Sequence, residues 1–389
     1  MPVPLSNSTT EIKKRAVSLD LARGTMLLLI ALAHAPLYLY GSEPGIMHRV
    51  EGITWYDQAV NFFGQFLIDN RARAMFAVLF GYGLVLAFNS QLSKGTSAKD
   101  ALKKIRRRSW YLIVFGIVLL VIIGGQDILM AYGFAGLLVS WVLLRNHKTL
   151  IRTFVLITLL YVIFTPQLWG FTMQSVGSYS FIPQLSATDT YLSTTFKKLI
   201  TFPVVPIFIH VMAPIIPPVL LGMWMARYQL LSKPDQHVKS IYLITITGLI
   251  VSLLGAIPLS LIGNVWNPSY YTVGLVNSLH IMTGMAGGLA YATLFGIIGT
   301  KIKDPGRFTF SLMALGKRSL TFFVFNETLL VLFLSPVALN LGGQVGNSIA
   351  AMIAVGIWGL SVVLATILEK RNMVGPLEIW MRKLVYKHK

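Results

Sequence analysis

Three ionisable residues, Asp20, Arg23 and His34, interrupt an otherwise apolar stretch that is long enough to cross a membrane, Ser18–Tyr40. Arg23 and His34 are eleven positions apart, which in a helix is about three turns, so both side chains point along one face about 16 Å apart. Asp20 shares this face and can pair with Arg23. Because a charged side chain in hydrocarbon costs about 3 kcal/mol or more, this face indicates a functional path.

A second charged cluster, Asp69-Asn70-Arg71-Ala72-Arg73, interrupts the next apolar stretch. Asp69 and Arg73 have the spacing of a helical i,i+4 pair and can neutralise each other if the helix continues. Arg71 then has no local partner, and we expect it to bind an anion. Two arginines near the middle of a bilayer favour binding, and a structural role is the alternative.

The chain as a whole has the composition of a membrane protein. Of its 389 residues, 55% are hydrophobic and 12% are charged, whereas about 25% are charged in a typical soluble domain. The polar gaps are too short for a sizeable soluble domain, so residues 1–389 are predicted to form one all-α transmembrane bundle. The absence of cysteine excludes disulfides and thiol catalysis.

Hydropathy predicts about ten membrane-spanning helices. Their ranges are 18–40, 57–88, 109–124, 128–144, 150–169, 200–226, 240–263, 276–300, 318–338 and 346–368. An even number places both termini on one side, and 27 of the 33 lysines and arginines lie in segments that alternate onto that side. The positive-inside rule therefore predicts that the N-terminal segment 1–17 and the basic C-terminal tail 369–389 are cytoplasmic.

The net charge of +19 does not indicate nucleic-acid binding, because the basic residues lie in short loops between apolar segments. There they act as orientation signals and contact anionic lipids. The strongest basic run, Lys94–Arg108, is interpreted either as a lipid-contacting loop or as a phosphate-binding rim for a ligand that enters there.

Other polar residues inside the predicted spans have mainly structural interpretations. The segment 200–226 contains five prolines, so it is predicted to be kinked or broken. His210 and His280 are interpreted as structural residues. Glu327 is interpreted as a protonated residue in a helix contact or as part of a proton path. The sequence has no histidine and cysteine spacing typical of a metal site.

Several short motifs, in order along nearly the whole chain, resemble the YeiB-like family of bacterial membrane proteins, which is defined by a domain of unknown function. The motifs are Leu19-Asp20-x-x-Arg23-Gly24, Leu79-Phe80-Gly81-x-Gly83, Asp127-Ile128-Leu129-x-x-Tyr132, Leu221-Gly222-Met223, Gly316–Thr321 and Gly375–Arg382. The resemblance implies a bacterial inner-membrane protein. It names no reaction.

The pattern Arg23-x10-His34 is also similar to the Arg-x10-His signature in the first helix of the acyltransferase-3 family, and the lysosomal heparan N-acetyltransferase family has a related layout. This resemblance implies transfer of an acyl group from cytoplasmic acyl-CoA to an acceptor in or across the membrane. His34 would be the general base, and Asp20 would orient Arg23. Arg23, Arg71 and Arg73 would contact phosphates or the oxyanion. No tightly bound cofactor is expected, and acyl-CoA is the co-substrate.

Other interpretations remain open. His34 can be a helix-packing histidine, and Asp20 with Arg23 can be a structural ion pair near the interface. A transporter or flippase for an anionic or lipid substrate would also use buried arginines and a kinked helix. A non-catalytic membrane partner protein would need none of this chemistry. The acceptor, a cell-envelope sugar, lipid or small metabolite, is not indicated by the sequence.

Overall fold

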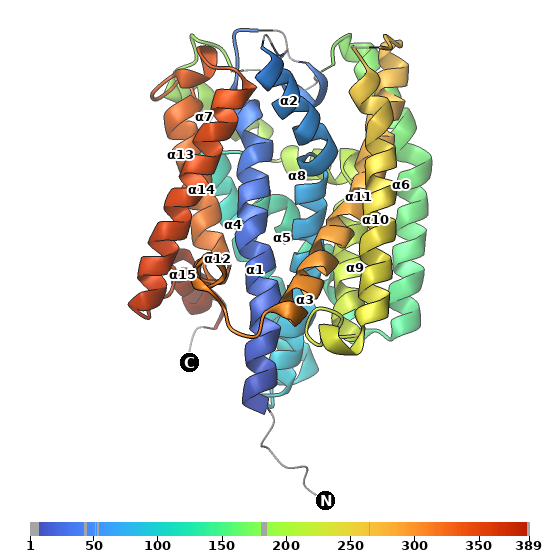
Figure 1. Cartoon of the computed structure of the whole chain (residues 1–389), viewed down its shortest axis with the longest axis vertical. Coiled ribbons are helices and arrows are strands. Elements are labelled where there is room, and N and C mark those ends of the chain that lie inside the picture. Colours follow the sequence, from blue (N-terminus) through green and yellow to red (C-terminus); the bar gives the residue numbers. More distant parts are fainter. Residues whose placement is uncertain are drawn as a thin grey trace, which may run out of the picture.

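The computed structural model describes residues 8–42, 45–50, 52, 54–179, 185–263 and 265–386, which form a bundle of α-helices (Figure 1). The helices are α1 (Ser8–His34), α2 (Trp55–Phe63), α3 (Arg71–Leu92), α4 (Ala98–Ile117), α5 (Leu129–Val139), α6 (His147–Val176), α7 (Tyr191–Thr201), α8 (Val205–Met212), α9 (Ile216–Arg227), α10 (Val238–Leu261), α11 (Tyr270–Lys301), α12 (Arg307–Lys317), α13 (Ser319–Leu334), α14 (Asn347–Lys370) and α15 (Pro376–Val385). Of the segments predicted to be cytoplasmic, residues 1–7 and 387–389 lie outside the described residues.

The predicted class, a polytopic membrane bundle, is confirmed, but the predicted count of about ten spans is not. Within the described chain, six helical segments are long and apolar enough to cross a membrane, and a bent helix pair makes a possible seventh. The six segments are Val17–Tyr38, Trp55–Leu92, His147–Val176, Pro234–Leu261, Tyr270–Lys301 and Asn347–Lys370. The count differs because other apolar segments form shorter helices, Leu129–Leu144 and Ser319–Leu334, and because α4 is basic in its first half.

The proline-rich segment 200–226 is broken, as predicted. It begins at the end of α7, continues through α8 and ends in α9, and α7 and α8 meet at an angle of 64°. A proline inside a helix removes a backbone hydrogen bond and clashes with the preceding turn. The prolines of α8 and α9 accordingly stand in the first turn of each helix, where a missing N–H costs little.

The second predicted span is also interrupted, and the break lies at Asp69-Asn70. A π-helical turn, Gly64–Ile68, follows α2. Asp69 is then extended and Asn70 is left-handed, with φ of 64°, before α3 begins. The predicted Asp69–Arg73 pair is not formed, because the helix does not continue. The Asp69 carboxylate instead accepts hydrogen bonds from Arg49 Nε at 2.8 Å and Nη2 at 2.9 Å.

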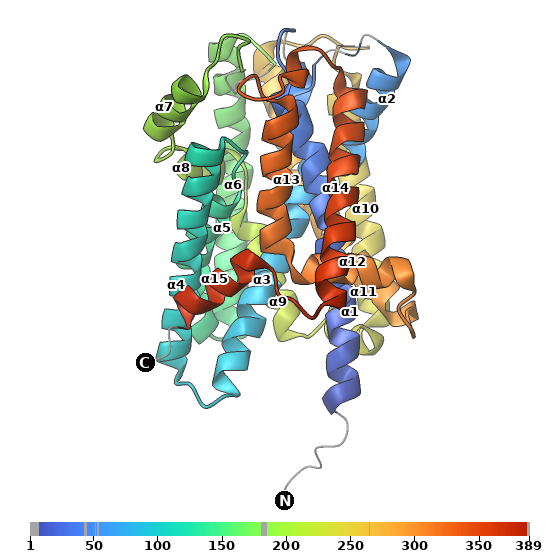
Figure 2. The same cartoon turned by 90° about the vertical axis from the view of Figure 1, so that its left-hand side faces the viewer.

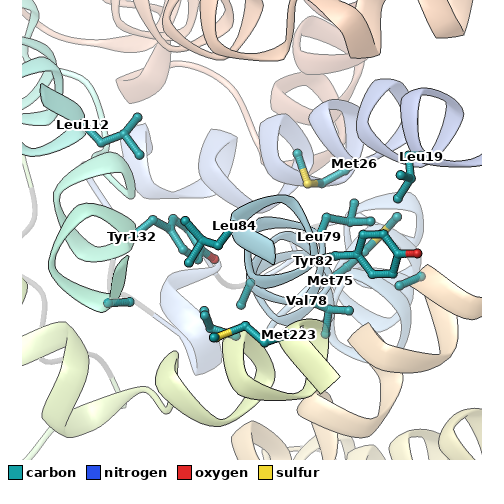
Figure 3. Packing of buried hydrophobic residues seen from close by; sticks show 14 of the residues in the cluster. Leu19, Met26, Met75, Val78, Leu79, Tyr82, Leu84, Leu112, Tyr132 and Met223 are labelled. Atoms are coloured by element: carbon teal, nitrogen blue, oxygen red, sulfur yellow. The ribbon is translucent and has the colours of Figure 1, made fainter. Parts of the chain in front are cut away.

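The largest hydrophobic core surrounds α3, which contacts α1, α4, α9 and α11. Figure 3 shows side chains of α3 between Met26 of α1 and Met223 of α9. The backbones of α3 and α9 approach closely at Gly81 and Gly222. A Cβ atom at Gly222 would overlap the carbonyl oxygen of Val78, and one at Gly81 would overlap that of Val219. Small residues therefore set the distance between these two helices.

The end of the bundle at which α1 begins also contains α15 and the turn between α3 and α4, and α15 lies across this end (Figure 2). We call it the basic end, because Lys94 in the turn and Arg382 on α15 lie there. Glu378 of α15 accepts hydrogen bonds from the N–H groups of Leu320 at 2.9 Å and Thr321 at 3.2 Å. The carboxylate thus caps the first turn of α13, whose N–H groups have no partner within their own helix.

Replacing Gly222 by valine is expected to destabilise the bundle by about 1–3 kcal/mol, because the new side chain forces α9 away from α3. The matched control is Gly356→Val on α14, where an added Cβ atom meets no atom within 4 Å. Thermal unfolding in detergent, followed by tryptophan fluorescence, measures both variants. Equal unfolding temperatures for the two variants would contradict the close contact between α3 and α9.

Candidate functional site

A cavity of about 1090 Å³ lies among α1, α3, α4, α5, α13 and α15 at the basic end. We call it the central cavity. Its charged lining residues are Asp20, Arg23, Arg108, Lys233, Lys317, Glu378 and Arg382, and its apolar lining residues include Met26, Phe80, Tyr132 and Phe323. It is larger than a typical pocket for a drug-sized molecule, and its mixed lining suits a ligand with apolar and anionic parts.

Two of the predicted binding residues, Asp20 and Arg23, line the central cavity together. They lie one turn apart on α1, with Arg23 Nη1 3.6 Å from Asp20 Oδ1. The Arg23 side chain is 30% exposed and that of Asp20 is 12% exposed. Arg23 thus has one charged partner and an open side toward the cavity, so it can contact an anionic group of a ligand. That role stays a prediction.

His34, the predicted base, is the last residue of α1 and is paired with a carboxylate. Its Nδ1 lies 2.6 Å from Oε1 of Glu327 on α13. The second Glu327 oxygen, Oε2, accepts hydrogen bonds from the Tyr38 hydroxyl at 3.0 Å and from the Gln126 N–H at 3.2 Å. Glu327 is completely buried, whereas the His34 side chain is 13% exposed. The carboxylate therefore holds the imidazole by one nitrogen.

The pairing of His34 with Glu327 was not predicted from the sequence, because 293 positions separate the two residues along the chain. Glu327 was predicted only to belong to a helix contact or to a proton path. One signal was available. An imidazole and a carboxylate, each inside an apolar span, both need a polar partner, and each is the strongest partner for the other.

Phe323 separates the central cavity from His34. It lines the cavity, and its ring lies edge-on to the imidazole with ring centroids 6.5 Å apart. Between Arg23 and His34, the α1 residues Leu27 and Ile30 are buried in hydrophobic clusters. His34 does not line the central cavity. The functional path predicted along the face from Arg23 to His34 is therefore interrupted, although both residues belong to one continuous helix.

Arg71 does not line the central cavity, and its N–H groups already donate hydrogen bonds within the protein. It has no exposed surface. Its Nη1 donates to the carbonyl oxygens of Gln65 at 3.0 Å and Asp69 at 2.8 Å, and its Nη2 donates to that of Ser252 at 2.7 Å. Its Nε donates to the Ser252 hydroxyl, and His280 lies against Nη1. Arg71 was predicted to bind an anion, but its partners here are neutral oxygen atoms, including carbonyl oxygens that the break in the helix leaves without a partner.

Arg73 does not line the central cavity either. Its Nη2 donates to Asn70 Oδ1 at 2.7 Å, and its carbonyl oxygen accepts the Tyr132 hydroxyl at 2.8 Å. Arg71 and Arg73 therefore secure the break before α3. His280, interpreted as structural, has this role too, because Asn70 Nδ2 lies 2.9 Å from its Nδ1.

Two further acidic residues cap helices rather than face a ligand. Asp127 accepts the N–H groups of Leu129 at 2.8 Å and Met130 at 2.9 Å, at the start of α5. Asp57 accepts the N–H of Ser348 at 2.8 Å, at the start of α14. A carboxylate at a helix N-terminus satisfies free N–H groups and favours the helix dipole.

The fold and the charged cavity define a polytopic membrane protein with a helix bundle that encloses a ligand-sized space. The family model DUF418, described as a protein of unknown function, matches residues 225–388 of the chain. The resemblance to the YeiB-like family is thereby confirmed. The match includes Glu327 and Phe323 but not His34. No curated protein matches the chain, and the similarity of the first helix to acyltransferases stays a prediction.

Replacing Arg71 by alanine is expected to lower the stability of the bundle by about 3 kcal/mol or more, because several buried carbonyl oxygens lose their donor at once. Arg152→Ala is the control, since Arg152 is exposed on α6. Thermal unfolding in detergent compares the two variants. An Arg71→Ala protein with unchanged unfolding temperature and impaired ligand binding would instead favour the anion-binding role.

Proposed function

We propose that the protein is a membrane acyltransferase in which His34 is the general base and Glu327 orients it. The observation that carries this proposal is the 2.6 Å contact between His34 Nδ1 and a buried carboxylate. This contact fixes the ring and leaves Nε2, for which the described residues provide no hydrogen bond, to act on an acceptor. A histidine held in this way by a carboxylate is the arrangement used for general base catalysis of acyl transfer.

The chemistry needs a proton acceptor and stabilisation of the resulting charge. Neutral His34 takes the proton from an acceptor hydroxyl or amine through Nε2 as the acceptor attacks the carbonyl carbon of a thioester. The tetrahedral intermediate collapses with cleavage of the carbon–sulfur bond, and the imidazolium returns its proton to the departing thiolate. Glu327 stabilises the imidazolium through Nδ1–H. The balance is one acyl ester or amide formed for each thiol released.

The donor enters the central cavity from the basic end in this proposal. The excess of lysine and arginine at this end supports a cytoplasmic orientation, and the family resemblance supports the inner membrane of a bacterium. Acyl-CoA is the donor class, with its anionic part near Arg23 and its thioester directed toward His34. The Phe323 ring must move aside for the thioester to reach the imidazole. Arg71 and Arg73 have no part in the proposed reaction, because their donors are bound within the protein.

Transport of an anionic or lipid substrate is the second candidate function. The observation that favours it is that Phe323 lines the central cavity and its ring also contacts His34, while His34 and Glu327 do not line the cavity. Such a barrier is also what a transporter has in one of its alternating states. Transport predicts movement of the substrate without release of a thiol.

The experiment uses the purified full-length chain in nanodiscs of native lipid extract, with acetyl-CoA and a thiol-reactive chromophore. The chain has no cysteine, so every thiol detected comes from the donor. His34→Asn and Glu327→Gln are expected to slow thiol release by about 100-fold, the usual contribution of a general base. His237→Asn, at the start of α10 and outside the central cavity, is the control.

Two outcomes decide the proposal. Thiol release that is abolished in the His34 variant, with an unchanged unfolding temperature, supports a catalytic base. Equal thiol release by the unmodified protein and the His34 variant, or no release by either, would disprove the proposed acyl transfer by His34. In the latter case, substrate uptake into vesicles that contain the protein distinguishes the transporter from a non-catalytic partner protein.

A further inference from the structure

A second hollow, of about 1350 Å³, lies beside the central cavity at the basic end. We call it the basic vestibule. Among the described residues, six cationic side chains line it, and Asp100 is the one carboxylate in its lining. The cations are Lys94, Lys103, Lys104, Arg107, Arg382 and Lys383. They come from the turn between α3 and α4, from α4 and from α15, and Figure 2 shows α15 next to α4 at this end.

The positive charge of the vestibule is not neutralised within the described part of the protein. None of the six cations forms an ion pair with a described carboxylate. Asp100 accepts a hydrogen bond from the Ser97 hydroxyl at 2.6 Å and belongs to the cap of α4. Lys104 donates to Gln91 at 2.8 Å and lies over the Tyr386 ring. Six cations around one hollow repel one another unless an anion lies among them.

The vestibule and the central cavity share lining residues. Five residues line both hollows: Arg382 and Val385 of α15, Tyr386 directly after it, and Ala87 and Ser90 of α3. A single ligand can therefore place an anionic part in the vestibule and an apolar part in the central cavity. A basic run that only contacts the membrane surface would not need to surround a hollow that joins an internal cavity.

We propose that the basic vestibule binds the phosphate groups of an amphipathic ligand whose remaining part lies in the central cavity. Clustered arginines and lysines are the usual ligands of phosphate, arginine through paired N–H groups and lysine as a point charge. Two or more phosphates match the number of cations better than one carboxylate does. The phosphates belong either to a free phosphorylated molecule or to a lipid headgroup, and the inference holds without the acyl-transfer reaction.

The test uses the full chain in nanodiscs of phosphatidylcholine and inorganic tripolyphosphate as the probe, followed by isothermal titration calorimetry. Saturable binding at one site is expected. The double variant Lys103→Gln/Arg107→Gln is expected to weaken it by about tenfold or more, because each cation near a phosphate contributes about 1 kcal/mol. The matched control, Lys148→Gln/Arg152→Gln, removes the same charge from exposed positions of α6 outside both hollows.

A second double variant, Arg382→Gln/Lys383→Gln, tests the vestibule from α15 and keeps the proposal falsifiable if the α4 variant does not fold. Loss of binding in a vestibule variant, with normal size-exclusion behaviour, supports the site. No saturable binding in phosphatidylcholine and no selective retention of anionic lipid, or equal loss in the α6 control, overturns it.

The source of the phosphate is assigned by repeating the titration in nanodiscs of phosphatidylglycerol. Competition by this lipid, together with its retention by the unmodified protein but not by a vestibule variant in mass spectrometry, assigns a lipid headgroup. Unchanged tripolyphosphate binding assigns a free phosphorylated molecule. Tripolyphosphate binding without any thiol release from acetyl-CoA would support the vestibule and remove the acyltransferase proposal, so the two proposals fail separately.

Discussion

The structure depends on the rule that a polar side chain inside an apolar bundle must have a partner there. A carboxylate such as Glu327 is costly to bury alone, and so is a charged imidazole. Their contact joins the end of α1 to the middle of α13, and the Tyr38 hydroxyl and the Gln126 N–H complete the set. The pair thus holds four segments of the chain together. It also fixes the position of the His34 ring, and with it the geometry of any reaction in which His34 takes part.

The same rule explains the break before α3. Ending one helix and starting another inside the bundle leaves carbonyl oxygens of Gln65 and Asp69 without partners, and Arg71 supplies the N–H groups for them. A buried arginine is therefore no sign of an anion where the backbone itself offers acceptors. The charges that remain available to a ligand are those at the basic end, where two connected hollows are lined by cations from several helices.

The sequence was sufficient for features that depend on neighbours along the chain. The membrane class, the Asp20–Arg23 pair and the broken proline-rich segment follow from hydropathy, helical spacing and proline geometry. The contacts of His34, Arg71 and Phe323 did not follow, because each joins helices that are remote in sequence. Arg71 meets Ser252 across 181 positions, for example. The count of about ten spans is not confirmed, because apolar composition alone does not show how long each helix is.

The cap that α15 provides has a mechanical consequence. Glu378 holds the first turn of α13, and the same short helix carries Arg382, which borders both hollows. One turn of α15 thus connects the lining of the two hollows to α13, the helix that bears Phe323 and Glu327. A ligand that contacts Arg382 would therefore lie one turn of α15 away from the carboxylate that caps the helix bearing Phe323 and Glu327.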